Sequence, residues 1–312
     1  MTGEIRIMGI VNLTPDSFFA GSRHQGADAV AQAAQMLSDG ADVIDFGACS
    51  TRPGSAQPSL EEEWSRLSPV LQAISCGEMV GYALPGTCAP PHTGRGRGPL
   101  AKPMGGAGTE RSEVEFPGSA YPAISIDTYR SEIVRRAYEM IGPFLVNDIS
   151  AGEMDPRMLE TVGRLGLPYV AMHMRGTPET MQSLTDYPDV VEEVKGYFAR
   201  FAGKAADAGI RDWILDPGFG FSKTVEQNYE LLRRLGELQK LGRPILAGLS
   251  RKSMVYKVLG IGPEEAMPAT QVVQFAALQG GATWLRVHDV VPAVQTARLY
   301  STMYTSSPGA AK

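Results

Sequence analysis

Short runs of consecutive apolar residues recur along the chain, and each run ends at a polar or charged residue. Because the runs are continuous rather than alternating, they are typical of strands covered on both faces, as in a parallel sheet. Between them, apolar residues recur at helical spacing. The runs, with their polar ends, are IMGIV before Asn12, DVI before Asp45, ISI before Asp127, FLV before Asn147, YVAM before His173, WIL before Asp216, ILAGL before Ser250 and WLRVH with Arg286 and His288.

The helical segments have recognisable boundaries. Ser59 and Glu62 form a capping-box pattern at the start of a predicted helix over residues 59–75. Gly40 marks the end of an earlier one over residues 26–40. Further helices are predicted over residues 130–141, 156–165, 189–209, 225–238, 264–280 and 291–304. Eight strand–helix units favour an α/β fold of the (β/α)8 TIM-barrel type over an open doubly wound sheet, in a single domain spanning residues 1–312.

One segment interrupts this rhythm. Residues 76–120 are rich in Gly and Pro and show little periodicity. The segment lies between the second helix and the third strand, which places it on the bottom face, opposite the mouth that holds barrel active sites. We expect a flexible or locally folded insertion, with partner docking as the alternative. Its GRGRG stretch has too few arginines for a nucleic-acid surface.

Composition narrows the functional classes. The 312 residues are 43% hydrophobic and 20% charged, with a formal net charge of -5, so a nucleic-acid partner is not expected. No run of about 18 apolar residues predicts a membrane span, and the N-terminus shows no signal-peptide pattern. Three cysteines (Cys49, Cys76 and Cys88) form no metal-binding or C-x-x-C spacing. We expect a soluble cytoplasmic protein.

In a barrel, the polar strand ends converge on one mouth, which indicates an enzyme. Asp127, Asn147 and Asp216 suit a flat heterocycle with an amino-pyrimidine edge, although each could instead be structural. Asp45 lies within its strand end and is interpreted as an anchor for the following loop rather than as a catalyst. His173 is equally consistent with a structural and a functional role.

The loops after the strands add candidates for anions and a cation. In GIVNLTPDSF, the amide oxygen of Asn12 could meet Mg2+ if the loop is an active-site lid rather than an ordinary turn. In STRPGS, Arg52 offers a planar fork for phosphate or carboxylate, or is simply solvated. Arg286 and His288 lie on the same side of an extended segment, which suits a diphosphate clamp.

Two further loops carry aromatic and basic residues. In DPGFGFSK, Phe221 could stack on a ring or pack in the core. In GLSRKS, consecutive residues cannot all point inward, and we favour Lys252 toward the ligand and Arg251 outward. No G-x-S-x-G, H-E-x-x-H or G-x-G-x-x-G pattern is present, which argues against nucleophilic hydrolysis, zinc chemistry and dinucleotide binding.

These motifs match a known family in order. GIVNLTPDSF, STRPGS, SIDT, NDISAG, MHMRGTP, DPGFGFSK, GLSRKS and RVHDV together resemble the dihydropteroate synthases, pterin-binding TIM barrels of folate biosynthesis. The resemblance covers nearly all of the chain except residues 76–120. Cys49 departs from it, because the family often has Glu there. The resemblance implies that (7,8-dihydropterin-6-yl)methyl diphosphate is joined to 4-aminobenzoate, giving 7,8-dihydropteroate and diphosphate.

The resemblance also implies roles for individual residues, with Asp127, Lys252 and Arg52 in catalysis. By similarity, the pterin contacts Asp127, Asn147, Met172, Asp216 and Lys252; the diphosphate contacts Thr51, Arg52, Arg286 and His288; 4-aminobenzoate contacts Phe18, Thr51, Pro53, Phe221, Lys252 and Ser253; and Mg2+ contacts Asn12.

The mechanism implied by the family is SN1-like. Diphosphate leaves first, Asp127 stabilises the pterin methylene cation, and loop closure excludes water. Sulfonamide drugs compete for the aminobenzoate pocket of this family, and its members are expected to be homodimers. The alternatives are a barrel resembling the methyltetrahydrofolate–corrinoid methyltransferases, which have no use for the diphosphate clamp, and a pterin-binding protein without catalysis.

Overall fold

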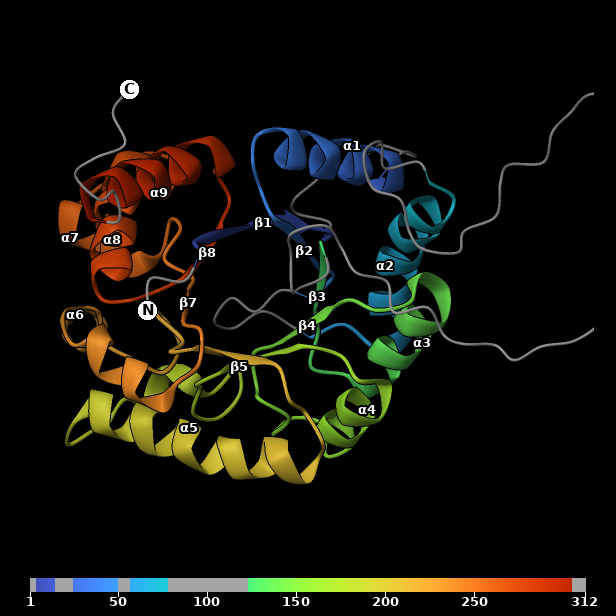
Figure 1. Ribbon diagram of the computed structural model, residues 1–312, viewed down its shortest axis with the longest axis horizontal. Helices are drawn as coiled ribbons and strands as arrows, with labels where there is room; N and C mark the ends of the chain where they lie inside the picture. Colours follow the sequence, from blue (N-terminus) through green and yellow to red (C-terminus); the bar gives the residue numbers. More distant parts are fainter. Residues whose placement is uncertain (1–3, 15–24, 50–56, 78–122, 305–312) are drawn as a thin grey trace, which may run out of the picture.

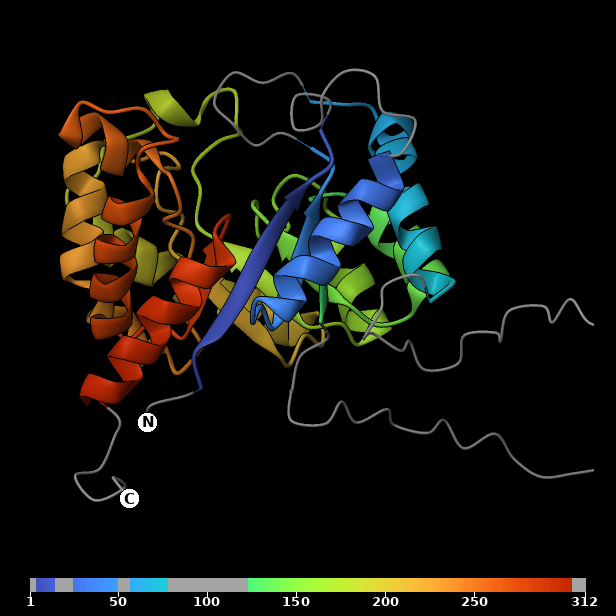
Figure 2. The ribbon, with the colours of Figure 1, turned by 90° about the horizontal axis from the view of Figure 1, so that it is seen from above.

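Eight parallel strands form one sheet that closes on itself, with helices around the outside (Figure 1 and Figure 2). The computed structural model describes residues 4–14, 25–49, 57–77 and 123–304. The strand order is β6-β5-β4-β3-β2-β1-β8-β7, and a parallel bridge between Leu215 and Ile245 joins the two edge strands. The predicted (β/α)8 barrel is therefore confirmed.

The strands are short, as expected when both faces are buried. They are β1 (Arg6–Asn12), β2 (Val43–Gly47), β3 (Ile124–Asp127), β4 (Leu145–Asp148), β5 (Tyr169–Met172), β6 (Trp213–Asp216), β7 (Leu246–Ala247) and β8 (Trp284–Val287). The helices are α1 (Gln25–Ser38), α2 (Leu60–Ser75), α3 (Ser131–Ile141), α4 (Met158–Leu165), α5 (Val190–Asp207), α6 (Val225–Arg233), α7 (Ser253–Leu259), α8 (Met267–Gln279) and α9 (Val290–Tyr304), with 3-10 turns η2 (Met181–Ser183) and η3 (Leu235–Leu241).

Local sequence signals explain several helix starts. The predicted capping box of α2 is present: Ser59 Oγ accepts from the backbone N–H of Glu62, and the Glu62 carboxylate accepts from that of Ser59. Thr224 and Gln227 form a second capping box at α6. The short helix α7 was not anticipated from the sequence, and the helix predicted over 225–238 is divided into α6 and η3.

Apolar residues fill the lower part of the barrel interior. Seven strands each contribute one buried side chain to this cluster, which we call the lower layer: Met8, Val43, Leu145, Val170, Ile214, Leu246 and Trp284. A second, larger core lies between the outer strand faces and the helices. Since both faces of the sheet are covered, the barrel is a packed body rather than a pore, and function is confined to its rim.

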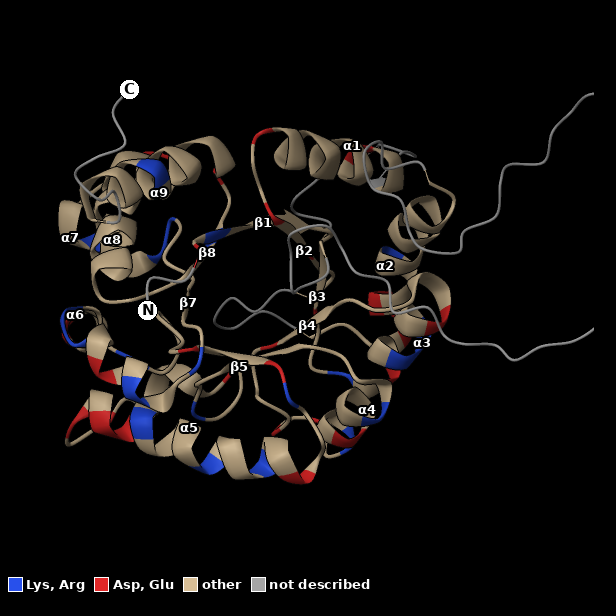
Figure 3. Cartoon of the chain, in the orientation of Figure 1, with Lys and Arg blue, Asp and Glu red and all other residues tan. Residues whose placement is uncertain are grey.

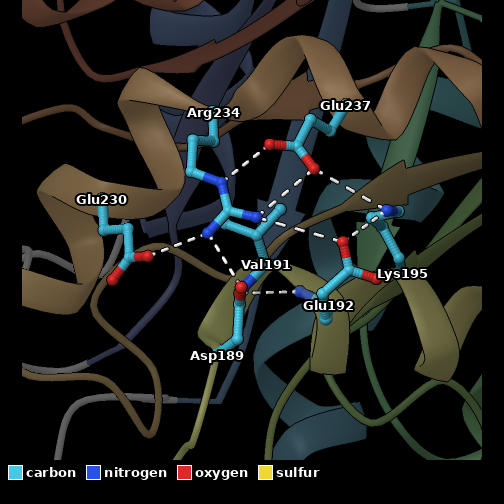
Figure 4. Close-up of polar contacts among 7 residues, drawn as sticks. All are labelled: Asp189, Val191, Glu192, Lys195, Glu230, Arg234 and Glu237. Carbon is cyan, nitrogen blue, oxygen red and sulfur yellow. Dashed lines mark hydrogen bonds and ion pairs between the residues drawn. The ribbon is translucent and has the colours of Figure 1, made fainter.

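Charged residues are common on the outer helices (Figure 3). Arg234, between α6 and η3, pairs with Glu230, Glu237 and Asp189 at the start of α5 (Figure 4). Lys195 of α5 extends this network through a 3.7 Å contact with Glu237. The network joins three elements on the outer wall. Among the described residues, no helix has the length and apolar character needed to cross a membrane.

Candidate active site

A polar layer lies directly above the lower layer, toward the C-terminal ends of the strands. Its centre is Asp45, which is fully buried. The Asp45 carboxylate accepts hydrogen bonds from Ser125 Oγ at 2.6 Å, Asn147 Nδ2 at 2.9 Å and Arg286 Nε at 2.7 Å. Four strands are tied together by this one carboxylate. The sequence predicted that Asp45 anchors the loop after β2. Its contacts are instead with side chains inside the barrel, which it orients.

Arg286 bridges two carboxylates in this layer. Its Nη2 atom lies 2.7 Å from Asp45 Oδ2 and 2.7 Å from Asp127 Oδ2. Burial disfavours the charged guanidinium, but Asp45 and Asp127 outweigh that effect and raise its pKa. Arg286 is therefore a fixed positive charge at the floor of the mouth, and in this structure it is paired with protein carboxylates.

Asp127 is balanced between opposing influences. Burial raises its pKa to about 7, and the charges of Asp45 and Glu63 act in the same direction, while Arg286 acts against them. When a buried carboxylate ionises near neutral pH, an approaching positive charge strongly stabilises its ionised form. This is the property required of a group that stabilises a cation during a reaction.

Asp216 and Lys252 form the opposite side of the mouth. Asp216 Oδ1 accepts from the Gly218 N–H at 2.8 Å, and burial raises the pKa of the carboxyl while Lys252 opposes the shift. Loss of solvation lowers the pKa of Lys252 to about 8, against the attraction of Asp216. The Lys252 Nζ atom donates to the Phe219 carbonyl and lies 4.7 Å from the centre of the Phe221 ring.

Two glycines leave space next to these groups. A side chain at Gly47 would stand 3.6 Å from Asp127 Oδ2 and 3.8 Å from Asn12 Oδ1. A side chain at Gly248 would stand 3.7 Å from Lys252 Nζ and 3.9 Å from Asp216 Oδ2. Glycine at these two positions therefore leaves the polar atoms of both pairs, Asp127 with Asn12 and Lys252 with Asp216, accessible from the mouth.

An apolar wall adjoins the polar groups. Met172, at the end of β5, is buried in a cluster to which the half-buried Phe221 ring also belongs. The other members of this cluster are Tyr129, Ile149, Met154, Met174 and Met181. Polarisable methionines beside hydrogen-bonding carboxylates suit a flat heterocycle, with its edge on the polar groups and its face on the wall.

The residues after β7 and β8 diverge in direction. Arg251 makes a bidentate ion pair with Asp289, at 2.9 Å and 2.7 Å, so it does not share the environment of Lys252. His288 is exposed, and its Nδ1 atom lies 3.0 Å from Ser250 Oγ. Ser250 thus orients the imidazole, while Ser253 is the first residue of α7.

Four predicted site residues belong to parts of the chain that the structure does not describe. Phe18, Thr51, Arg52 and Pro53 lie outside the described residues, as does nearly all of the 76–120 segment. Within the described ranges, no group of three or more His, Cys, Asp or Glu side chains is arranged to hold a metal ion.

Lys223 was missed as a site residue, although it lies in the DPGFGFSK motif. It is buried, and its Nζ atom lies 3.0 Å from Nδ1 of His173. Burial lowers the pKa of His173 well below its ordinary value, and the charge of Lys223 adds to this effect. His173 is therefore a neutral acceptor for an ammonium group, which the sequence pattern did not distinguish from a ligand contact. The available signal was a lysine at the end of a motif that contains two glycines.

Comparisons with known proteins agree with this geometry. The sequence profile of the pterin-binding enzyme family matches residues 8–81 and 115–288, leaving a gap inside the Gly- and Pro-rich segment. Dihydropteroate synthase of Escherichia coli strain K12 is 37% identical over 296 residues, which cover 94% of this chain and 89% of the relative. The chain belongs to the dihydropteroate synthase family.

Solved structures of dihydropteroate synthases share the fold over nearly the whole chain. The enzyme from Clostridium difficile, crystallised in the presence of pteroic acid, has a TM-score of 0.77 at 31% identity and covers 98% of both chains. The enzyme from Xanthomonas albilineans, determined with 4-aminobenzoic acid, has a TM-score of 0.77 at 33% identity, with coverage of 97% of this chain and 94% of that one.

Proposed function

We propose that this protein joins (7,8-dihydropterin-6-yl)methyl diphosphate to 4-aminobenzoate, giving 7,8-dihydropteroate and diphosphate, as a transferase of folate synthesis. The observation that carries the proposal is the mouth itself: Asp127 and Asp216 lie beside a methionine-rich wall, with Lys252 between the ring of Phe221 and Asp216. The family membership and the ligands of the two solved relatives support it.

The pterin would lie with its edge on the buried carboxylates and its face on the wall. Asp216 would accept from the amino-pyrimidine edge, because a carboxylate takes two parallel N–H bonds. Asn147 is oriented for the same ring, since its Nδ2 atom donates to Asp45 and its amide plane is therefore set. Met172 would contact the ring face, and Lys252 would donate to a ring acceptor.

The reaction follows an SN1-like course. The C–O bond between the pterin methylene and the diphosphate breaks, and diphosphate leaves with the electron pair. Asp127, ionised in the substrate complex, stabilises the methylene cation electrostatically. The amine nitrogen of 4-aminobenzoate then donates its lone pair to the methylene carbon, and the proton it loses passes to diphosphate or water.

The leaving diphosphate needs positive charge. We assign binding of the diphosphate to Arg286 and His288 at the end of β8, together with Arg52 and the neutral hydroxyl of Thr51. Asn12 Oδ1 and Asp127 Oδ2 both lie near Gly47, and oxygen ligands of this kind fit Mg2+ when diphosphate and water complete the shell. When bound, Mg2+ would neutralise charge on the leaving group.

The aminobenzoate pocket is assigned to Phe221, Lys252 and Ser253, together with Phe18, Thr51 and Pro53. The Lys252 ammonium over the Phe221 ring supports this assignment, because it places a cation where the carboxylate or ring of the second substrate would arrive. Sulfonamides, which resemble 4-aminobenzoate, are expected to compete for this pocket.

A homodimer is proposed from the surface of the last three helices. Helix α8 carries no charged residue, and Figure 3 shows little charge on α8 and α9. Large apolar side chains are exposed here, which is unusual for a surface left in water. They are Val258 and Leu259 of α7, Val272 of α8, and Leu299, Met303 and Tyr304 of α9.

Two further assignments complete the proposal. We place the protein in the cytoplasm. It has only three cysteines, and the two that the structure describes, Cys49 and Cys76, form no disulfide. We also propose that the 76–120 segment takes no part in catalysis, because it connects the end of α2 to the start of β3, at the face opposite the active-site mouth. Replacing residues 77–119 by a short glycine linker should leave turnover largely intact, whereas a folded but inactive deletion variant would contradict the placement.

The deciding experiment measures diphosphate release from the pterin diphosphate, with and without 4-aminobenzoate and Mg2+. We expect release coupled to formation of dihydropteroate. Calorimetry on the same sample would show whether the pterin diphosphate binds. Binding without product would instead indicate a pterin-binding protein that lacks catalysis.

A further inference from the structure

The loop between β6 and α6 has a strained backbone that carries two of the proposed substrate contacts. It begins at Asp216, includes Phe221 and ends at the N-cap residue Thr224. Gly218 and Gly220 have φ values of 69° and 82°, and Ser222 has a φ of 46°. A non-glycine residue in the left-handed region is strained, so specific side-chain contacts must hold this conformation.

Lys223, a buried residue of the loop itself, supplies such contacts. It is 4% exposed, and its Nζ atom donates to the carbonyls of Gly218 at 3.0 Å and Phe221 at 3.1 Å. The third proton goes to Nδ1 of His173 at 3.0 Å, so all three donors of the ammonium are used. Because an ammonium has no acceptor, the His173 proton must lie on Nε2.

Lys252 holds the same loop through the intervening residue. Its Nζ atom donates to the Phe219 carbonyl, between the two carbonyls bound by Lys223. A side chain at Gly218 would collide with the carbonyl oxygen of His173, and one at Gly220 would stand 3.2 Å from Lys252 Cδ. The two lysines therefore contact neighbouring peptide groups of one loop, and glycine at these two positions permits both the positive φ and the close packing.

We infer that Lys223, held by neutral His173, is a positioning residue for the pterin site: it orients the β6–α6 loop so that Asp216 and Lys252 face the ligand. The Gly218 peptide is the physical link. Its carbonyl accepts from Lys223, and its N–H donates to Asp216 Oδ1 at 2.8 Å. The inference rests on the proposed function for the identity of the ligand, but the order of the loop can be measured without any ligand.

The electrostatic surroundings disfavour the charged form of Lys223, so its hydrogen bonds must stabilise the ammonium. Burial lowers the pKa of Lys223 to about 7, and the charges of Lys252 and Arg175 lower it further, while Asp216 raises it. The group is thus costly to keep charged. A buried lysine without a ligand or loop to hold would be disfavoured, whereas one that satisfies three acceptors is not.

The primary test replaces Lys223 by methionine, which keeps length but removes every donor. We expect Lys223→Met to weaken binding of the pterin diphosphate, measured by calorimetry without 4-aminobenzoate, by ~10-fold or more. The KM for 4-aminobenzoate should rise as well, because the same loop carries Phe221 of the proposed aminobenzoate pocket. Thr296→Val on α9 is the matched control, because it removes buried hydrogen bonds distant from the mouth and should leave pterin affinity unchanged.

A second pair of variants tests His173. In His173→Asn, the amide oxygen can replace Nδ1 as an acceptor, whereas His173→Leu removes it. We expect near-normal pterin affinity in the first variant and a loss like that of Lys223→Met in the second. This pair carries the test if Lys223→Met does not fold. Equal pterin affinity in both histidine variants would overturn the inference.

A double-mutant cycle separates positioning from a general loss of stability. If Lys223 acts through Asp216, then Lys223→Met should add little to the affinity loss already caused by Asp216→Asn. Amide hydrogen exchange of residues 218–224 should be faster in Lys223→Met than in Thr296→Val. Unchanged loop exchange would overturn the inference, even if wild-type protein bound no pterin. Absence of pterin binding by the wild type would contradict the proposed function alone.

Discussion

The barrel interior has two layers of side chains, two residues apart along the strands. The lower layer is apolar and the upper layer is polar. In the lower layer, Val43, Leu145, Ile214 and Trp284 pack against each other. Two residues further along the same strands stand Asp45, Asn147, Asp216 and Arg286. Alternate residues of a strand point to the same side. The interior-facing side chains of each strand therefore change from apolar core to polar site over a distance of about 7 Å.

The comparison shows how one interior serves stability and chemistry. The lower layer removes apolar surface from water and needs no particular partners. The upper layer places several charges away from water, which is tolerable only because each is matched: Asp45 with three donors, and Arg286 with two carboxylates. A substitution below should change folding, whereas a substitution above should change the reaction.

The largest effect is expected from Asp127→Asn. Removing the charge that stabilises the cation should lower kcat by ~10²–10³-fold, while pterin affinity changes little, because the amide keeps the shape of the carboxylate. Steady-state kinetics with calorimetry of pterin binding would check this. Losses of equal size in kcat and affinity would argue against the cation role.

The pH profile should be a narrow bell. Asp127 must be ionised, and its pKa of about 7 makes turnover fall as pH drops below that value. Lys252 must be protonated, and its pKa of about 8 makes turnover fall as pH rises above that value. In Asp127→Asn, residual activity should lose the acid limb and keep the alkaline one. An acid limb that persists in this variant would assign it to another group.

A matched pair on β6 compares the layers directly. Ile214→Ala, below, should lower the free energy of unfolding by ~2–5 kcal/mol and leave pterin affinity intact in the folded fraction. Asp216→Asn, above, should weaken pterin binding by ~10-fold or more without destabilising the fold, because burial already disfavours its charge. Urea unfolding and calorimetry of pterin binding on both variants would check this. A loss of affinity in Ile214→Ala, or a loss of stability in Asp216→Asn, would contradict the division between the layers.

The smallest effect is expected on the outer wall. Arg234→Met removes the partly exposed ion pairs that join α5, α6 and η3 (Figure 4). Exposed pairs contribute little and are screened by salt, so the midpoint of thermal unfolding should fall slightly, and less at high ionic strength. Kinetic constants should not change, and a change in them would connect this surface to the mouth.

Local patterns in the sequence predicted much of the fold. Continuous apolar runs located the strands, and the Ser59–Glu62 box located the start of α2. The β7 strand is only two residues long, and α7 was overlooked, because a short helix directly after a loop of basic residues has little periodicity. Strand ends were predicted well, since the change from apolar to polar residues is itself the signal.

The sequence alone determined the barrel, the polar mouth and, through its motifs, the family, because strand periodicity and motif order are local properties of the chain. Only the tertiary structure decided which charges meet. Arg286 lies between Asp45 and Asp127, and Lys223 reaches His173, because barrel closure and strand register bring together residues that are far apart in sequence. Such partnerships depend on distances across the barrel, which no local pattern encodes.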